Sequence, residues 1–414
     1  MGKSLPLVIV GGGVGGAFAA QEARRQGYLE PIVLVCGEPY LPYDRPPLSK
    51  EYLLEQNSEV PELLPGSFYS NNDIDIVLGS MACELDASAK VLTLENGTSL
   101  DYGALILATG SRARVLRCVP SLDNVFYLRS IEDSSRLRAA LQGRPQVVIA
   151  GGGFIGLEVA AAASALGAEV SIVEIMEAPL SGILGTKVAQ EFAQLHRSRG
   201  VSIYTSESVV DVISDSLVRA VVTSTGRTIP CDVLVVGVGA APMVELAVSA
   251  GIQAEAGIPV DAHCRTEMPS VFAIGDVARL DHPVVGSPIR VEHWDSARRH
   301  ASAAISTLVG KPSPCTTLPW FWSDQYGINF QYVGYAPVWQ EVVLRGDPAH
   351  WDFSAFYLLE GQVVACLAAE RPKEIRAAEH MISNRIRIPG EQLLNDQIDL
   401  REILRDHQRE RRSH

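Results

Sequence analysis

Two glycine clusters with the same internal spacing are the residues of this sequence whose types and positions best suit chemistry. Each follows the pattern G-x-G-x-x-G, and the six glycines are Gly11, Gly13, Gly16, Gly151, Gly153 and Gly156. The first glycine of the pattern permits a tight turn, the second lets the backbone approach a pyrophosphate, and the third lets a helix pack on a strand. The N-terminus of that helix offers unpaired N–H groups and a positive dipole to phosphate. We therefore predict two dinucleotide-binding loops in one chain.

An acidic residue follows each loop at the end of the next apolar run. Glu38 stands in the string VCGE, and Glu174 stands in SIVE. A carboxylate at this place can hydrogen-bond a ribose hydroxyl, and it repels the 2′-phosphate that distinguishes NADP from NAD. No arginine occurs between Glu174 and Ser181. The second loop is therefore predicted to prefer NADH to NADPH, with an ordinary solvated strand end as the alternative for Glu174.

Two nucleotide sites in one chain suggest a division of labour. One fold can hold a flavin permanently while the second admits a nicotinamide, so that a hydride passes between the rings. The string Ile274-Gly275-Asp276 supports a flavin, because an aspartate after such a glycine can accept hydrogen bonds from a ribityl or pyrophosphate region. The same aspartate could equally cap a helix.

The segment Tyr43–Lys50, YDRPPLSK, is the most distinctive local string. Its two prolines stiffen the backbone, so that Arg45 and Lys50 are presented from a fixed loop. Lys50 could then reach a flavin and pair with a carboxylate. Glu158, two residues after Gly156, is placed on a helix where it could be that carboxylate. Composition alone favours the alternative that Lys50 is an exposed lysine.

The elements that must position these residues follow from apolar runs around each loop. Strand, glycine turn, helix and strand form a βαβ unit, and the flanking strands are expected within Leu7–Val10, Ile32–Val35, 147–150 and Val170–Val173. After about residue 315 aromatic residues cluster and no further phosphate loop occurs. We predict an α/β protein with two doubly wound, Rossmann-like dinucleotide-binding domains and a C-terminal α+β domain.

Composition limits the function further. A length of 414 residues suggests two or three domains, and a net charge of −13 argues against a nucleic-acid partner. No apolar run approaches the ~20 residues of a membrane helix, and the N-terminus leads into a strand rather than a signal peptide. We therefore expect a cytoplasmic protein without a membrane partner. The seven cysteines lack any C-x-x-C spacing, so neither a disulfide framework nor a metal site is expected.

Several strings, in this order, resemble those of the oxygenase-coupled NADH-dependent ferredoxin reductases. They are YDRPPLSK, ATG, GGGFIGLEVA, VGVGAAP, IGD, VEHW and PWFWSDQYG, and the resemblance covers essentially the whole chain. This family, which includes putidaredoxin reductase and the reductases of aromatic-ring dioxygenases, has an FAD domain interrupted by an NAD domain. The resemblance implies an FAD domain of residues 1–112 and 240–315, an NAD domain of 113–239, and a C-terminal domain of 316–414 that covers the flavin.

The resemblance also implies which residues meet the cofactors. For bound FAD they are the first loop with Val14 and Gly15, then Glu38, Lys50, Ala82, Arg129, Gly275, Asp276 and Trp294. For NADH they are the second loop with Phe154 and Ile155, then Glu158, Glu174, Gly239 and Glu292. Arg45, Thr109, Gly110 and His293 are expected to complete the cofactor sites. Position 82 is often valine in the family and is alanine here.

The resemblance implies the following chemistry. FAD takes a hydride from NADH and passes single electrons to an acidic [2Fe–2S] ferredoxin that docks near the flavin and feeds a cytochrome P450 or a ring-hydroxylating oxygenase. Trp322 would lie near the isoalloxazine. Our own hypothesis, beyond the resemblance, is that Lys50 and Glu158 form an ion pair beside it. Two alternatives of the same architecture stay open, an NADH oxidase or peroxidase and an NADH-sensing flavoprotein. The oxidases use a redox cysteine, and Arg45–Lys50 contains none.

Overall fold

The computed structural model describes residues 4–55, 59 and 61–405. They form two compact units, each assembled from three segments of the chain. Within the described residues, the first unit comprises 4–44, 61–112 and 240–319. The second comprises 45–55, 59, 113–239 and 320–405. Each unit is described by itself below.

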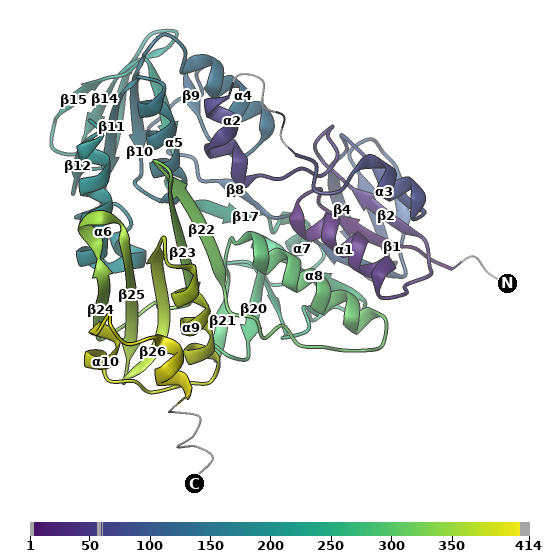
Figure 1. Ribbon diagram of the computed structural model, residues 1–414. Helices are drawn as coiled ribbons and strands as arrows, with labels where there is room; N and C mark the ends of the chain where they lie inside the picture. Colours follow the sequence, from purple (N-terminus) through teal and green to yellow (C-terminus); the bar gives the residue numbers. More distant parts are fainter. Residues whose placement is uncertain (1–3, 56–58, 60, 406–414) are drawn as a thin grey trace. The chain divides into compact units, whose positions relative to one another are not determined.

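A parallel sheet of order β19-β7-β1-β2-β3 forms the centre of the first unit (Figure 1). Its strands are β1 (Leu7–Val10), β2 (Ile32–Val35), β3 (Ile74–Val77), β7 (Ala104–Leu107) and β19 (Val271–Ala273). All four residues of β1 are buried, as expected for a parallel strand that is covered on both faces. Alanines and glycines on α1 (Val14–Arg25) let it pack closely on α8 (Trp294–Leu308).

Smaller elements complete the first unit. They are α3 (Gly66–Asn71), β4 (Ala82–Asp86), β5 (Val91–Leu94), β6 (Ser99–Asp101), β17 (Ala240–Pro242), α7 (Glu245–Ser249), β18 (Ile258–Val260), η2 (Gly275–Val277), β20 (Ala278–His282) and β21 (Ser287–Ile289). The short strand β8 (Ser111–Ala113) pairs with β17. Sheets β4-β5-β6 and β18-β20-β21 are separate from the central parallel sheet.

The second unit contains another parallel sheet, of order β12-β11-β10-β16-β9. Its strands are β9 (Val125–Phe126), β10 (Gln146–Ala150), β11 (Glu169–Glu174), β12 (Ser202–Thr205) and β16 (Val233–Val236). The helices of this part are η1 (Pro46–Ser49), α2 (Glu51–Leu54), α4 (Ile131–Ala140), α5 (Phe154–Ala165) and α6 (Ser181–Ser198). An antiparallel sheet adds β13 (Val209–Ser214), β14 (Val218–Thr223) and β15 (Thr228–Pro230).

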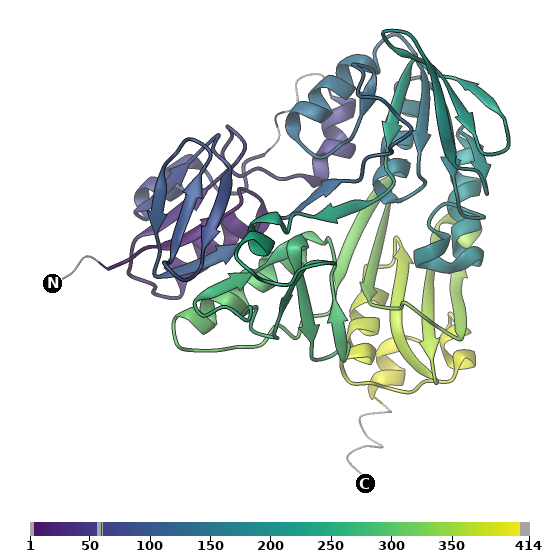
Figure 2. The same ribbon diagram turned by 180° about the vertical axis from the view of Figure 1, so that it is seen from behind.

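The C-terminal part of the second unit is a five-stranded antiparallel sheet of order β22-β23-β26-β25-β24. The strands are β22 (Trp320–Gln325), β23 (Ile328–Gly334), β24 (Glu341–Asp347), β25 (Asp352–Leu359) and β26 (Gln362–Ala369). Figure 2 shows this green-to-yellow sheet with α9 (Pro372–Ser383) packed against it. The helices η3 (Pro348–His350) and α10 (Gly390–Leu394) complete it. The predicted α/β class, with two doubly wound sheets and a C-terminal α+β part, is confirmed.

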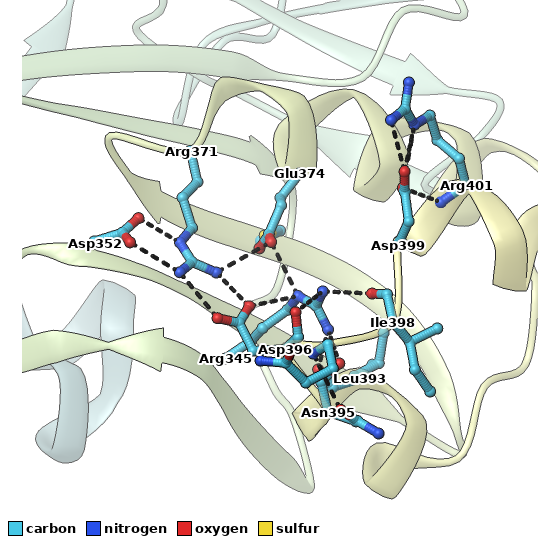
Figure 3. Close-up of polar contacts among 12 residues, drawn as sticks. Arg345, Asp352, Arg371, Glu374, Leu393, Asn395, Asp396, Ile398, Asp399 and Arg401 are labelled. Atoms are coloured by element: carbon cyan, nitrogen blue, oxygen red, sulfur yellow. Dashed lines mark hydrogen bonds and ion pairs between the residues drawn. The ribbon is translucent and has the colours of Figure 1, made fainter.

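Two arginines fasten the last described turns to this sheet (Figure 3). Arg345 on β24 is buried, and its Nε donates to Glu374 at 2.9 Å. The same guanidinium donates to the backbone carbonyls of Leu393, Asn395 and Ile398. Arg371 binds Asp352 and Asp396, and these hydrogen bonds raise the pKa of Arg371. Such multiple, partly buried bonds to a planar guanidinium hold the C-terminal segment in one position.

Candidate nucleotide and redox site

The first glycine loop has the geometry that a pyrophosphate needs. Gly11 has φ +127°, and a Cβ there would lie 2.1 Å from the carbonyl oxygen of Ala108. A Cβ on Gly16 would lie 1.9 Å from the carbonyl oxygen of Gly11, so only glycine allows α1 to approach β1 this closely. A Cβ on Gly13 would meet nothing within 4 Å, and no side chain caps α1. The backbone therefore packs tightly at Gly11 and Gly16, whereas the space at Gly13, beside the helix N-terminus, is open. A phosphate group fits such an open helix N-terminus.

The second loop repeats this arrangement in the second unit. Gly151 has φ +102°, and its Cβ would lie 2.4 Å from the carbonyl oxygen of Gly237. A Cβ on Gly156 would lie 2.3 Å from the oxygen of Gly151, whereas one on Gly153 would meet nothing within 4 Å. No side chain caps α5, and its first turn carries no acid. The same glycine spacing therefore forms the same open loop at a helix N-terminus in both units. We call each of these two loops a glycine cradle.

Each predicted ribose acid already has a partner within its own unit. Glu38 accepts a hydrogen bond from the hydroxyl of Tyr43 at 2.6 Å. Glu174 is buried, and its two oxygens accept the N–H groups of Gly152 at 2.6 Å and Met176 at 2.8 Å. Glu174 is therefore not an ordinary solvated strand end, and it fixes the shape of the second loop. A carboxylate has about four acceptor positions, so a ribose hydroxyl can still bind.

Other predicted residues of the first unit lie near its glycine loop or at the start of α8. Asp276, in η2, accepts the hydroxyl of Ser111 at 3.0 Å. The indole of Trp294 donates to Asp44 at 2.8 Å. The hydroxyl of Thr109 donates to the carbonyl oxygen of Met243 at 2.7 Å.

The positions of the remaining predicted residues of the first unit do not by themselves indicate a cofactor site. Ala82 begins β4, Glu292 pairs with Arg290 at 2.6 Å, and His293 precedes α8. Gly15 lies within α1, with the side chain of Ile274 3.4 Å from where its Cβ would be. Gly110 and Gly275 have φ of +72° and +71°, which explains why glycine is used there.

The second unit brings Lys50 and Glu158 together. Lys50 Nζ lies 2.9 Å from Glu158 Oε2, and the two side chains are 10% and 5% exposed. The prolines of the loop form the 3₁₀ helix η1, whose carbonyl at Pro46 accepts a second bond from Nζ at 3.1 Å. The alternative of an exposed lysine, which composition favoured, is therefore wrong. In such a buried ion pair the positive charge of Lys50 is held in a fixed place, where it can act strongly on a group bound beside it.

Glu158 has two further donors that the sequence did not single out. Ser49 donates to Oε2, and Ser323 on β22 donates to Oε1 at 2.6 Å. Both serines lie within the strings PPLSK and WFWSDQ that carried the resemblance, so their location was visible although their partner was not. With these bonds, every oxygen of the buried carboxylate is held by side chains from separate elements.

Aromatic residues of the second unit gather near the same elements. Trp322 stacks on Trp320 with ring centroids 5.4 Å apart, and Phe154 meets Phe321 edge-on at 4.8 Å.

The other predicted residues of the second unit lie on loops or at a helix start. Arg45 donates to the carbonyl oxygen of Arg129 at 2.7 Å. Two other predicted residues are Ile155, exposed at the start of α5, and Gly239, whose carbonyl accepts the N–H of Arg114 at 2.9 Å.

The cysteines of the described chain are all free thiols, and most are buried. Burial raises the pKa of Cys36 and of Cys231 to about 12. A thiol must ionise to act as a nucleophile, so these two are poor redox groups. Within the described ranges, no group of three or more His, Cys, Asp or Glu residues could hold a metal ion, and no helix could cross a membrane.

Comparisons with known proteins match the chain over almost its whole length. Residues 5–301 match the family model described as pyridine nucleotide-disulphide oxidoreductase, and residues 320–404 match the model described as reductase C-terminal. The ferredoxin–NAD(+) reductase component of the anthranilate 1,2-dioxygenase system of Burkholderia cepacia is 36% identical, covering 96% of this chain and 99% of that protein. Putidaredoxin reductase CamA of Pseudomonas putida is 33% identical, covering 96% of both chains.

Two solved structures have the same fold throughout. The reductase chain in the covalent putidaredoxin reductase–putidaredoxin complex superposes with a TM-score of 0.94 at 32% identity, covering 97% of this chain and 98% of that one. The ferredoxin reductase for the CYP199A2 system from Rhodopseudomonas palustris gives a TM-score of 0.93 at 34% identity, covering 96% and 99%.

Proposed function

Because this chain belongs to the pyridine nucleotide-disulphide oxidoreductase family, we propose that it is an NADH-dependent ferredoxin reductase with bound FAD. The observation that carries this proposal is the pair of open glycine cradles, one in each unit. Relatives that align over almost their whole length and are named as ferredoxin–NAD(+) reductase components of dioxygenase systems support the electron acceptor. The partner is a [2Fe–2S] ferredoxin, acidic in character, that docks near the flavin and feeds a cytochrome P450 or a ring-hydroxylating oxygenase. The location is the cytoplasm.

In this proposal the two cradles have different ligands. The loop of Gly11, Gly13 and Gly16 with Glu38 and Asp276 binds FAD within residues 1–112 and 240–315. The loop of the second unit with Glu174 binds NADH within residues 113–239, and residues 316–414 form the third domain. A bound flavin would supply the essential chemistry, because it accepts two electrons as a hydride and releases them singly.

The protein's own groups then bind the two nucleotides, orient them and adjust the local charge. The N–H groups at the starts of α1 and α5 bind the two pyrophosphates. Lys50 supplies a positive charge that favours the negative charge arriving with the hydride, and Glu158 holds the ammonium in place. Trp322 is assigned to the flavin ring and Glu292 to the nicotinamide. No proton transfer is needed for hydride transfer itself, so no residue is assigned as a general base.

The oxidase or peroxidase alternative receives no support from the Arg45–Lys50 loop or from Cys36. The loop from Arg45 to Lys50 holds no cysteine. Cys36, which ends the first βαβ unit, is buried with a pKa of about 12. An enzyme of that kind needs a thiol that ionises readily beside the flavin. Transfer to a separate one-electron acceptor is therefore the function that the site supports best.

The purified protein should be yellow, and denaturation should release one FAD per chain. Addition of NADH should bleach the flavin, and the reduced protein should then reduce a [2Fe–2S] ferredoxin at a rate well above its oxygen consumption. Flavin identity is checked by chromatography, and electron transfer is followed by the ferredoxin absorbance under anaerobic conditions. Release of FMN, or NADH oxidation that yields peroxide and no reduced ferredoxin, would refute the proposal.

The preference for NADH over NADPH should depend on Glu174. Glu174→Ala combined with Ile175→Arg should shift the ratio of kcat/KM values toward NADPH by about tenfold or more, because a repelling carboxylate is lost and an attracting cation is gained. Ile175 is 69% exposed, so arginine can be placed there without disturbing the core.

Ile175→Arg alone is the matched control, since it adds the cation and leaves the carboxylate on Gly152 and Met176. It should shift the ratio less than the double variant. A wild type that favours NADPH, or a double variant that matches the single one, would exclude Glu174 as the specificity residue.

A further inference from the structure

A buried chain of hydrogen bonds continues behind Glu158 in the second unit. Ser323, which donates to Glu158, accepts from Gln325 Nε2 at 3.0 Å. Gln325 Oε1 lies 2.9 Å from Nε2 of His196, a residue of α6. His196 Nδ1 lies 3.1 Å from the hydroxyl of Tyr326. Ser323, Gln325 and His196 are all fully buried, so these hydrogen bonds join α5, β22 and α6 in the interior of the unit.

The direction of every bond in this chain can be derived from its two ends. Glu158 is paired with the Lys50 ammonium, so it is a carboxylate and only accepts. Ser323 must therefore give its single proton to Glu158, and it can only accept from Gln325. The amide nitrogen of Gln325 then faces Ser323, which leaves its oxygen facing His196.

The state of His196 agrees with this direction. Burial lowers the pKa of His196 to about 4, so at neutral pH its ring carries one proton. That proton must be on Nε2, because Gln325 Oε1 can only accept. Nδ1 is then an acceptor, and Tyr326 must donate to it. From Tyr326 to Glu158, every group donates toward the carboxylate.

The chain transmits orientation and not protons. A hydroxyl or an imidazole can pass a proton on, but the amide of Gln325 donates through nitrogen and accepts through oxygen. A proton could cross it only if the amide changed to an unfavourable tautomer. The chain therefore acts as a fixed series of dipoles, each strengthened by its neighbours in a low-dielectric interior.

We propose that His196, acting through Gln325 and Ser323, is a positioning residue that aims a hydroxyl donor at Glu158 and so holds the Glu158–Lys50 ion pair in its productive geometry. This inference rests on the proposed function, in which that pair controls reduction by NADH. Without the donor from His196, Gln325 can turn, and its oxygen can take the proton of Ser323 away from Glu158. One oxygen of the buried carboxylate then lacks its donor, and the pair loses its fixed position.

The variant His196→Phe tests this directly. It keeps a ring in the cavity and removes the Nε2 donor. The rate constant for flavin reduction at saturating NADH, measured by stopped flow, should fall about three- to tenfold, in line with the loss of one neutral hydrogen bond. The dissociation constant for NADH from the same experiment should change by less than twofold, because the chain does not meet the nucleotide loop. His196→Gln restores an N–H donor at a similar reach, and it should recover most of the rate.

A matched control is Tyr357→Phe. The buried hydroxyl of Tyr357 on β25 donates to the carbonyl oxygen of Leu184 on α6 at 2.9 Å, so it also joins α6 to the antiparallel sheet. Its loss should lower the thermal midpoint as His196→Phe does and leave the reduction rate unchanged. If His196→Phe proves too unstable, Gln325→Met breaks the next bond of the chain, and it should produce the same slowing.

A spectroscopic measurement separates this inference from the proposed function. The ¹⁵N chemical shifts of labelled histidine should show His196 as the neutral Nε2–H tautomer at pH 7. An Nδ1–H tautomer would overturn the chain whatever the enzymatic activity. Equal rates in His196→Phe and wild type, or equal slowing in Tyr357→Phe, would overturn the positioning role. A wild type that NADH does not reduce would instead refute the proposed function.

Discussion

Gly13→Asp should yield a folded protein without flavin, whereas Gly153→Asp should yield a yellow protein that binds NADH poorly. Each glycine is the N-cap of its helix, with φ of −94° and −75°, which any residue can adopt. A Cβ at either position meets nothing within 4 Å. Aspartate is among the best N-cap residues and glycine is only slightly worse, so the substitution should stabilise each helix by roughly a few tenths of a kcal/mol.

The two aspartate substitutions should weaken ligand binding without destabilising the fold. The new carboxylate occupies the helix N-terminus where a pyrophosphate would bind, and it repels that phosphate. We expect FAD affinity to fall more than a hundredfold in Gly13→Asp, and the dissociation constant for NADH to rise more than tenfold in Gly153→Asp. These factors correspond to more than about 2.7 kcal/mol for FAD and more than about 1.4 kcal/mol for NADH. Flavin content is measured by absorbance, and NADH binding by titration.

Asparagine at the same two positions separates charge from bulk. It caps a helix about as well as aspartate and has the same size without the charge. Gly13→Asn and Gly153→Asn should therefore bind their nucleotides much better than the aspartate variants. Retention of full FAD by Gly13→Asp, or loss of FAD through Gly153→Asp, would show that the two cradles are assigned to the wrong ligands.

Lys50→Met should slow reduction of the flavin by NADH about ten- to a hundredfold. Methionine has a similar length, and the shape of the loop is set by Pro46 and Pro47 in η1, so the fold should persist. The variant removes a positive charge that is only 10% exposed. At such a site we expect a loss on the order of 1–3 kcal/mol, which corresponds to that factor if it appears wholly in the transition state. The flavin midpoint potential should fall as well.

The partner variant shows whether Lys50 and Glu158 act together. Glu158→Gln alone should have a smaller effect, because its amide oxygen can still accept from Ser323 and its amide nitrogen can donate to the hydroxyl of Ser49. The double variant should cost less than the sum of the single ones, since each single change already breaks the pair. Stopped-flow bleaching measures all three rates. Strictly additive effects, or a wild-type rate in Lys50→Met, would contradict a role for the ion pair.

The sequence by itself determined the elements that depend on neighbouring residues. The apolar runs at Leu7–Val10 and Ile32–Val35 coincide with β1 and β2, and both glycine patterns form turns between strand and helix. This was predictable because a tight turn, a positive φ and an uncapped helix start are decided within a few residues. The place of Glu174 at the end of β11 was predictable for the same reason.

Only the tertiary structure decided which distant side chains meet. Glu158 receives Lys50 from a loop 108 residues earlier and Ser323 from a strand 165 residues later. His196 meets Gln325 across 129 residues, and no local pattern marks either residue as polar core. Whether Lys50 is exposed or buried depends on how η1, α5 and β22 pack together. This packing cannot be predicted from a single sequence. Local interactions select the elements, but pairing between remote segments depends on the packed core, where a buried charge without a partner is destabilising.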